Sequence, residues 1–370
     1  MTLAMKQAPN ASAAALAVLT AGHRRKGMIA IAALVGICVL LMLLSLGAGA
    51  FAIAPGRVAD ILLAKLGLGP AGLLDSREAL VVLNIRMPRL LLGALVGAAL
   101  AISGALMQGL FRNPLADPAL VGVASGGALG AALSIVLLDQ LLGNQLRFLQ
   151  DHVLPIAAFG GSLATTILLY RIASRAGRTS IALFLLAGIA IAAIANAGIG
   201  VLVFLADDRQ LRDITFWMMG SLSGATWAKA SSCALVLAIA LSVFVRMGRH
   251  LDLLVLGESE AFHTGVDVER LKLLSIVLVS SMTGVAVSIC GVIGFVGIVV
   301  PHLLRLGIGP AHRLLLPASA CLGAAMLVAA DTVARTIAAP AEMPIGILTA
   351  AIGAPFFLAL LLRQRKLVGL

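Results

Sequence analysis

Charged residues are scarce in this sequence. Only 12% of its 370 residues are Asp, Glu, Lys or Arg, whereas soluble domains carry about 25%. Hydrophobic residues make up 61% of the chain, and the mean hydropathy is +1.09. These values exclude an ordinary soluble domain and predict a polytopic membrane protein.

Aromatic residues and cysteines are also few. Because aromatic residues form only 4% of the chain, we expect any apolar cavity to be lined mainly by aliphatic side chains. The four cysteines are Cys38, Cys233, Cys290 and Cys321. Each lies inside an apolar run, without the Cys-x-x-Cys or Cys/His spacing that is typical of metal sites. We therefore predict packed thiols and no metal site.

The chain has no motif that would supply energy. It lacks the Gly-x4-Gly-Lys-Ser/Thr loop that cradles nucleotide phosphates. Charges within apolar runs, which ion-coupled carriers need for a relay, are nearly absent, and Asp331 and Arg335 lie close to the end of one run. The sequence thus predicts a chain that is not an enzyme and binds no cofactor, and that takes energy from a partner if it transports.

Ten apolar runs approach or exceed the length of about 20 residues that a membrane-spanning helix needs. They cover residues 28–50, 90–110, 119–138, 153–172, 181–205, 230–247, 271–291, 292–308, 314–333 and 344–362. Gly291, Gly294 and Gly297 interrupt a stretch too long for one helix, so we place a break there. We predict an all-α protein with about ten spans; nine or eleven would put the termini on opposite sides of the membrane.

Lysine and arginine positions predict the orientation. Residues 1–27 form a polar tail that ends in a basic cluster, and residues 28–370 form the transmembrane domain. With the tail in the cytoplasm, ten spans place most of the 27 Lys and Arg residues inside and most of the 16 acidic residues outside. This is the positive-inside bias, with both termini cytoplasmic. The net charge of +11 therefore reflects topology and not nucleic-acid binding. A cleaved signal peptide, with AGAFA at 48–52 as its cleavage site, is the alternative.

Two arginines, Arg86 and Arg89, stand just before the apolar run 90–110. A charge at the centre of a bilayer costs about 2.5 to 3.5 kcal/mol on insertion scales. We therefore expect both arginines at the membrane surface.

The largest polar stretch on the predicted inner face is residues 246–272, which mixes leucines with acidic residues. We expect one or two short amphipathic helices, with breaks at Gly257 and Gly265. An exposed segment with this many leucines predicts a docking surface for a partner. A solvated connector is the alternative.

Several long motifs share one family pattern. They are RMPRLLLGALVGAALAISGALMQGLFRNPLADPALVGVASG at 86–126, LRDITFWMMGSLSG at 211–224, LGESEAFHTGV at 256–266, GFVGIVVPHLLRL at 294–306 and ADTVARTIAAPAEMPIGILTAAIGAPFFLALLL at 330–362. From about residue 30 to the C-terminus, the chain resembles the permease subunits of bacterial type II ABC importers for iron chelates, haem and vitamin B12. The haem importers are the nearest in overall likeness.

The resemblance implies an assembly in the bacterial inner membrane. It consists of two copies of this chain, two cytoplasmic ATPase subunits that bind ATP and Mg²⁺, and a periplasmic substrate-binding protein. The transported ligand would be haem or a similar iron chelate, moved from periplasm to cytoplasm. A ferric siderophore or cobalamin is the alternative within this architecture. A stand-alone secondary transporter is an alternative of a different class.

The resemblance also implies roles for individual residues. Arg86, Arg89 and Arg335 match the outer-face arginines that pair with glutamates of the binding protein; anchoring to lipid head groups is the alternative. Residues 256–266 match the loop that couples the permease to the ATPase. The positions carried over there are Leu256, Gly257, Glu258, Ala261 and Gly265.

A third match lies just before the run 181–205. Arg178, Thr179 and Ser180 correspond to the segment that gates the cytoplasmic end of the translocation path in the family that the chain resembles. A helix cap is the alternative, because Ser and Thr side chains commonly cap helix N-termini.

Overall fold

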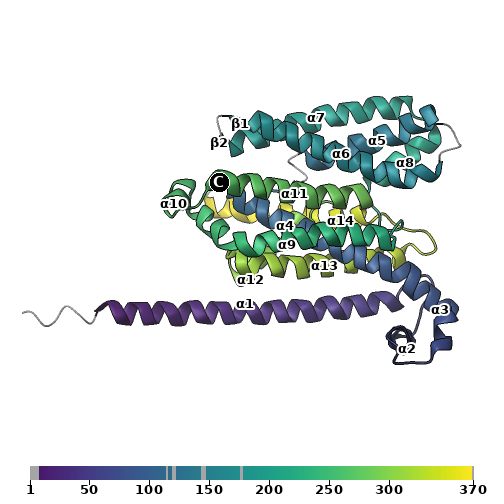
Figure 1. Cartoon of the computed structure of the whole chain (residues 1–370), viewed down its shortest axis with the longest axis horizontal. Helices are drawn as coiled ribbons and strands as arrows, with labels where there is room; N and C mark the ends of the chain where they lie inside the picture. Colours follow the sequence, from purple (N-terminus) through teal and green to yellow (C-terminus); the bar gives the residue numbers. More distant parts are fainter. Residues whose placement is uncertain (1–7, 114–115, 119–121, 143–146, 176–177, 369–370) are drawn as a thin grey trace, which may run out of the picture.

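The computed structural model describes residues 8–113, 116–118, 122–142, 147–175 and 178–368. Its elements, in chain order, are α1 (Ala8–Gly47), α2 (Pro55–Lys65), η1 (Ala71–Asp75), α3 (Arg77–Leu80), η2 (Val81–Arg86), α4 (Met87–Leu110), α5 (Val123–Leu142), α6 (Arg147–Ala173), β1 (Ser174–Arg175), β2 (Arg178–Thr179), α7 (Ile181–Leu205), α8 (Asp208–Met218), α9 (Trp227–Leu256), α10 (Glu258–His263), α11 (Val268–Cys290), α12 (Val296–Ile308), α13 (His312–Ile337) and α14 (Ile345–Val368). The predicted all-α class is confirmed (Figure 1).

In the described part of the chain, seven helices are long and apolar enough to cross a membrane. Three shorter apolar helices, Val123–Leu137, Val296–Ile308 and Ile345–Leu360, accompany them. Each of these coincides with one of the predicted apolar runs. How many of them cross the bilayer, and on which side the termini lie, stay predictions.

The first helix is longer than its apolar run. α1 continues without a break from Ala8 to Gly47, so it begins within the predicted tail, and the domain boundary at residue 27 stays a prediction. Residues 1–7 of the predicted tail lie outside the described residues. α1 packs mainly against α13 along one side of the bundle (Figure 1).

α4 is the central helix of the molecule, and nearly all of its residues are buried. It packs against α9, α11, α12 and α13 (Figure 1). A Cβ atom at Gly97 would meet the backbone of Gly323 in α13, and one at Gly104 would meet the backbone of Gly297 in α12. Small residues are needed on both sides of such contacts because the helix backbones touch.

α5, α6, α7 and α8 form a separate layer, which Figure 1 shows above the central helices. α11 joins the two layers because it packs against α4 and α9 on one side and against α5 and α6 on the other. The predicted break after α11 is confirmed: Gly291 has a φ of +72°, and α12 begins at Val296.

The functional residues gather at opposite ends of this bundle. α10 and the β1–β2 hairpin lie at one end, together with the start of α1 and the end of α14 (Figure 1). α2 and α3 lie at the other end (Figure 1). We refer to these as the α10 end and the α3 end.

Candidate functional site

At the α3 end, two arginines hold the C-terminus of α1. Arg86 Nη1 donates to the carbonyl oxygen of Leu46 at 2.6 Å, and Arg335 Nη1 donates to that of Ala48 at 2.9 Å. The last carbonyls of a helix have no intrahelical partner and carry partial negative charge. Both arginines therefore stabilise the end of α1.

The third arginine, Arg89, is held by two carboxylates. Its Nε and Nη2 atoms lie 3.0 and 2.9 Å from Oδ1 of Asp331, and its Nη1 lies 2.9 Å from Oε1 of Glu342. Arg335 also faces Asp331, with Nε 3.6 Å from Oδ2. We call Arg86, Arg89, Asp331, Arg335 and Glu342 the arginine cluster.

The position of Arg86 and Arg89 at the membrane surface stays a prediction, but their side chains are buried within the protein. Arg86 is 6% and Arg89 is 9% exposed within this chain. The sequence shows each arginine at the end of an apolar run, but it does not show that Asp331 and the end of α1 pack against them. Paired and hydrogen-bonded charges can be buried, whereas unpaired ones cannot. In the arginine cluster only the side chain of Glu342, 48% exposed, is widely accessible.

A π-helical turn leads into α4 next to this cluster. The N–H of Met87 donates to the carbonyl of Val82, five residues back, and η2 ends at Arg86. Pro88 follows and has no N–H to donate. π turns of this kind are frequent at functional sites.

At the α10 end, α9 continues to Leu256, and a short segment then turns back into α11. We call residues 256–266, the predicted coupling loop, the coupling segment. Gly257 has a φ of +136° and Gly265 one of +85°, values that L-residues with a side chain rarely adopt. The two predicted glycine breaks are confirmed, although only six residues, α10, form a helix between them.

The apolar surface here is smaller than predicted. Leu251 and Leu254 are buried against the body of the protein, whereas Leu256 is 71% and Phe262 is 70% exposed. Ala261 is fully buried and packs α10 onto the bundle. Leu256 and Phe262 are therefore the most exposed of the large apolar side chains that a partner could reach here.

The predicted gate residues lie in the β1–β2 hairpin and at the start of α7. Ser174 pairs with Thr179, and Arg175 pairs with Arg178. The Ser180 side chain accepts a hydrogen bond from the N–H of Leu183 at 3.3 Å. Ser180 thus caps α7, as the alternative interpretation predicted; the gating role stays a prediction.

One buried lysine joins the coupling segment to the hairpin. Lys272 Nζ donates to Oε2 of Glu258 at 2.8 Å, to Oε1 of Glu269 at 3.0 Å and to the carbonyl of Thr179 at 3.1 Å. Oε2 of Glu269 also accepts from the N–H of Thr179 at 2.9 Å. We call these four residues the Lys272 junction.

Sequence reasoning did not single out Lys272 or Glu269. Their spacing of three residues on one helix is typical of a solvent-exposed ion pair. Nothing in the sequence places Thr179, 93 positions earlier, against Lys272. Only the packing of the hairpin on α11 brings them together.

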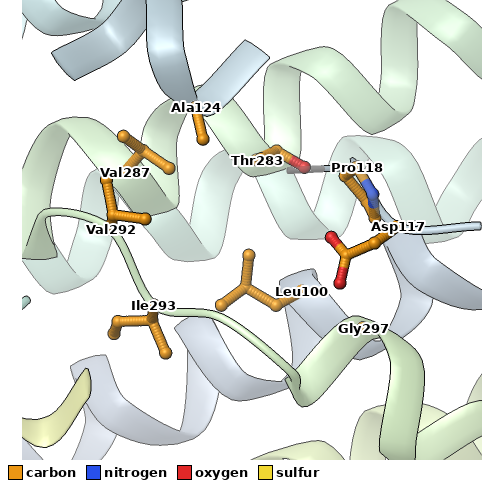
Figure 2. Close-up of a pocket in the computed structure, with 9 residues that line it drawn as sticks. All are labelled: Leu100, Asp117, Pro118, Ala124, Thr283, Val287, Val292, Ile293 and Gly297. Atoms are coloured by element: carbon orange, nitrogen blue, oxygen red, sulfur yellow. The ribbon is translucent and has the colours of Figure 1, made fainter. Parts of the chain in front are cut away.

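A small cavity lies inside the bundle between α4, α5, α11 and α12. Its volume is about 10 Å³, about enough for one water molecule. Figure 2 shows the Asp117 carboxylate directed into it, near Leu100 and Gly297. The Thr283 hydroxyl also lines it and has no hydrogen-bond partner among the described residues. The sequence did not mark Asp117 as buried, and the cavity is far too small for a metal chelate.

Cysteines and other potential metal ligands are scattered. Cys38, Cys233 and Cys290 are buried thiols, and Cys321 is partly buried. In the described ranges, no three His, Cys, Asp or Glu side chains lie close enough to hold a metal ion.

A bundle of long apolar helices whose ionic groups gather at its two ends defines a polytopic membrane protein of the permease class. Residues 13–363 match the FecCD transport family, to which the chain therefore belongs. The family resemblance predicted from the sequence motifs is confirmed. The chain is a multi-pass inner-membrane permease of the ABC importer class.

Individual relatives give the same assignment. The chain is 49% identical over 284 residues to the hemin transport system permease protein HmuU of Yersinia pestis, covering 77% of this chain and 84% of the relative. It is 46% identical over 290 residues to the cobalamin import system permease protein BtuC of Halobacterium salinarum, covering 78% and 75%. A solved structure described as an inward-facing metal-chelate type ABC transporter covers 90% of this chain and 98% of its own, with a TM-score of 0.77 and 31% identity.

Proposed function

We propose that this chain is the membrane-spanning subunit of an ATP-driven importer that moves haem, or a similar iron chelate, from the periplasm to the cytoplasm. The 49% identity to a hemin permease over 84% of that protein carries the proposal. The 46% identity to a cobalamin permease favours cobalamin as the second candidate. A ferric siderophore would use the same architecture.

The energy comes from partner chains in this proposal. The absence of a phosphate-binding motif in the sequence supports a chain that is not an enzyme and binds no cofactor itself. Two ATP-binding cassette subunits bind ATP and Mg²⁺ on the cytoplasmic side. The chain pairs with a second copy of itself, and a periplasmic binding protein delivers the ligand.

The coupling segment is the proposed contact with the ATPase. The exposed side chains of Leu256 and Phe262 support this role. Gly257 and Gly265 shape the turns, and Ala261 packs α10 onto the bundle, so that Glu258 is held at the start of α10. Residues 1–27 form a cytoplasmic extension and residues 28–370 the permease domain.

The arginine cluster is the proposed docking site for the binding protein. The planar guanidinium group of Arg89 can donate two parallel hydrogen bonds to one carboxylate. Its partner Glu342 is half-exposed, so a carboxylate of the docking protein can replace Glu342 on Arg89. Arg86 and Arg335 keep the surrounding backbone in place.

The proposed cycle links the two ends. A loaded binding protein docks at the α3 end, ATP binding closes the ATPase subunits, and their movement displaces the coupling segments. The two copies then rock, and the hairpin residues Arg178, Thr179 and Ser180 gate the cytoplasmic exit of a path between the copies. A secondary transporter would instead work alone and follow an ion gradient.

The test is uptake into liposomes that contain this chain and its ATPase, with loaded binding protein outside. Haem, a ferric siderophore and cobalamin are compared, with and without ATP inside. We expect ATP-dependent uptake of haem. Uptake of another ligand would correct the substrate, and uptake that ignores ATP but follows an ion gradient would contradict the ABC mechanism.

A further inference from the structure

Lys272 uses its whole hydrogen-bonding capacity on groups from three separate segments. A lysine ammonium group has three N–H donors. Here they bind Glu258 in α10, Glu269 in α11 and the Thr179 carbonyl in β2. The side chain is only 2% exposed. Lys272 itself belongs to α11, so its side chain connects this helix to both α10 and the hairpin.

Lys272 thereby contacts both parts of the protein that we propose to move, α10 and the gate hairpin. Glu258 is the first residue of α10, directly after the Gly257 turn. Thr179 immediately precedes Ser180, which caps α7. The connection from α10 to the start of α7 thus passes through the Lys272 side chain, which reaches Thr179 directly at its carbonyl and through Glu269 at its N–H.

Stability alone does not explain this arrangement. Burying an ammonium group carries a desolvation cost, and replacing a buried ion pair by apolar groups is often neutral or stabilising. The bonds instead fix the relative position of α10, α11 and β2, although α7, α8 and α9 separate β2 from α10 in the chain. Resting on the proposed function of α10 and of the hairpin, we propose that Lys272 is a positioning residue. It ties the ATPase-coupling helix to the gate hairpin, so that a displacement of α10 moves the start of α7.

The first test replaces Lys272 by methionine, which keeps an unbranched side chain and removes the charge. ATP hydrolysis and ligand uptake are measured in the same liposomes that contain the complete complex. We expect Lys272→Met to hydrolyse ATP while the number of ligands moved per ATP falls at least tenfold. The matched control is Arg270→Met on the same helix, whose side chain is 84% exposed, and we expect it to transport normally.

A second variant tests whether Lys272 couples α10 to the hairpin or only balances the charges of Glu258 and Glu269. Lys272→Met leaves Glu258 and Glu269 without their cation. In Lys272→Met/Glu269→Gln one of these charges is removed, and the glutamine oxygen can still accept from Thr179. If Lys272 only balanced charge, transport would recover; we expect the loss to persist because α10 stays detached. Recovery, or loss of assembly in both variants, would assign Lys272 to stability and overturn the proposal.

Movement can be followed directly with spin labels at Ser259 in α10 and Arg175 in β1. Both positions are exposed, and the four native cysteines are replaced by alanine. In the complex with otherwise native sequence, we expect the distance between the labels to stay constant when ATP binds. In Lys272→Met we expect it to change, and a distance that stays constant there would contradict the link.

These experiments distinguish a failure of the proposed importer mechanism from a failure of the role proposed for Lys272. Native complexes that take up ligand without ATP would overturn the importer mechanism itself. Native complexes that require ATP, combined with an unchanged ligand-to-ATP ratio in Lys272→Met, would overturn only the role of Lys272.

Discussion

At the scale of single residues, buried charged side chains connect helices that are far apart in the sequence. Arg89 and Asp331 form a largely buried ion pair between α4 and α13, the two helices whose backbones also meet at Gly97 and Gly323. Because both side chains are largely removed from water, each charge needs the opposite charge of the other to compensate for its lost hydration. A buried pair of this kind is costly to break from one side and far less costly to replace as a whole.

Arg89→Ala should therefore destabilise the protein by about 3 to 5 kcal/mol, since Asp331 is left buried with less compensation. Thermal unfolding in detergent, followed by circular dichroism, measures this as a lower Tm. The control is Arg57→Ala, which breaks the partly exposed pair with Glu78 and should cost about 0 to 1 kcal/mol. Equal decreases in Tm in the two variants would show that the ion pair of Arg89 with Asp331 contributes no more to stability than the pair of Arg57 with Glu78.

Glu342→Gln should strengthen docking of the binding protein severalfold. The substitution weakens the bond that holds Arg89 Nη1 and leaves the arginine more available to a carboxylate from outside. Binding of the isolated binding protein to the permease in nanodiscs, measured at two salt concentrations, checks this. The matched variant Glu78→Gln, at the same end of the bundle, should leave the affinity unchanged. If Glu342→Gln left the affinity for the binding protein unchanged, the binding protein would dock at a site other than Arg89.

At the scale of elements, short irregular segments carry the proposed functions. The π-helical turn before α4, the six-residue α10 and the two-residue strands β1 and β2 lie at the ends of long regular helices. Each depends on a local chemical feature: Pro88 after the π turn, glycines on both sides of α10, and the Ser180 cap after β2. The long helices supply the rigid frame that holds these segments.

Leu256→Asp/Phe262→Asp should release the ATPase, because it places two charges on the proposed apolar contact. We expect the amount of ATPase that co-purifies with the permease to fall more than tenfold while the permease itself stays folded. Leu68→Asp, an equally exposed leucine near α2, is the control and should retain the ATPase. Retention by the double variant would exclude α10 as the main contact. Ala261→Asp would not test this, since Ala261 is buried.

At the scale of the whole molecule, the enclosed cavity of one copy is too small for the proposed ligands. Pockets for drug-sized molecules typically have volumes of about 300 to 1,000 Å³, whereas the cavity between α4, α5, α11 and α12 holds about 10 Å³. A groove of about 890 Å³ lies between α6, α9 and α11, but it is open on one side. α7 in the outer layer also leaves many apolar side chains uncovered by this chain, among them Leu186, Ile189, Ile194 and Phe204. An open groove and an uncovered apolar helix favour a path between two copies.

We therefore predict that the permease purified with its ATPase contains two copies of this chain. Native mass spectrometry of the detergent-solubilised complex measures the number of copies. A complex with one copy that still supports ATP-dependent uptake would contradict a path between copies.

The positions of the helices follow directly from the sequence. Long apolar runs become helices wherever they occur, and each predicted run coincides with one. The breaks at Gly257, Gly265 and Gly291 were also predictable, because their positive φ values are ones that glycine adopts readily. The family was predictable from motifs, since the motifs are long and ordered along the chain.

Tertiary structure alone decided which charges are buried and what they contact. The sequence predicts Arg86 and Arg89 at the membrane surface, but only the packing shows that Arg86 contacts the end of α1 and that Arg89 contacts Asp331. Lys272 has the spacing of an exposed residue, yet the hairpin closes over it. Local sequence determines whether a segment forms a helix. The partner of a charged side chain depends on residues tens to hundreds of positions away, which meet only when the helices pack.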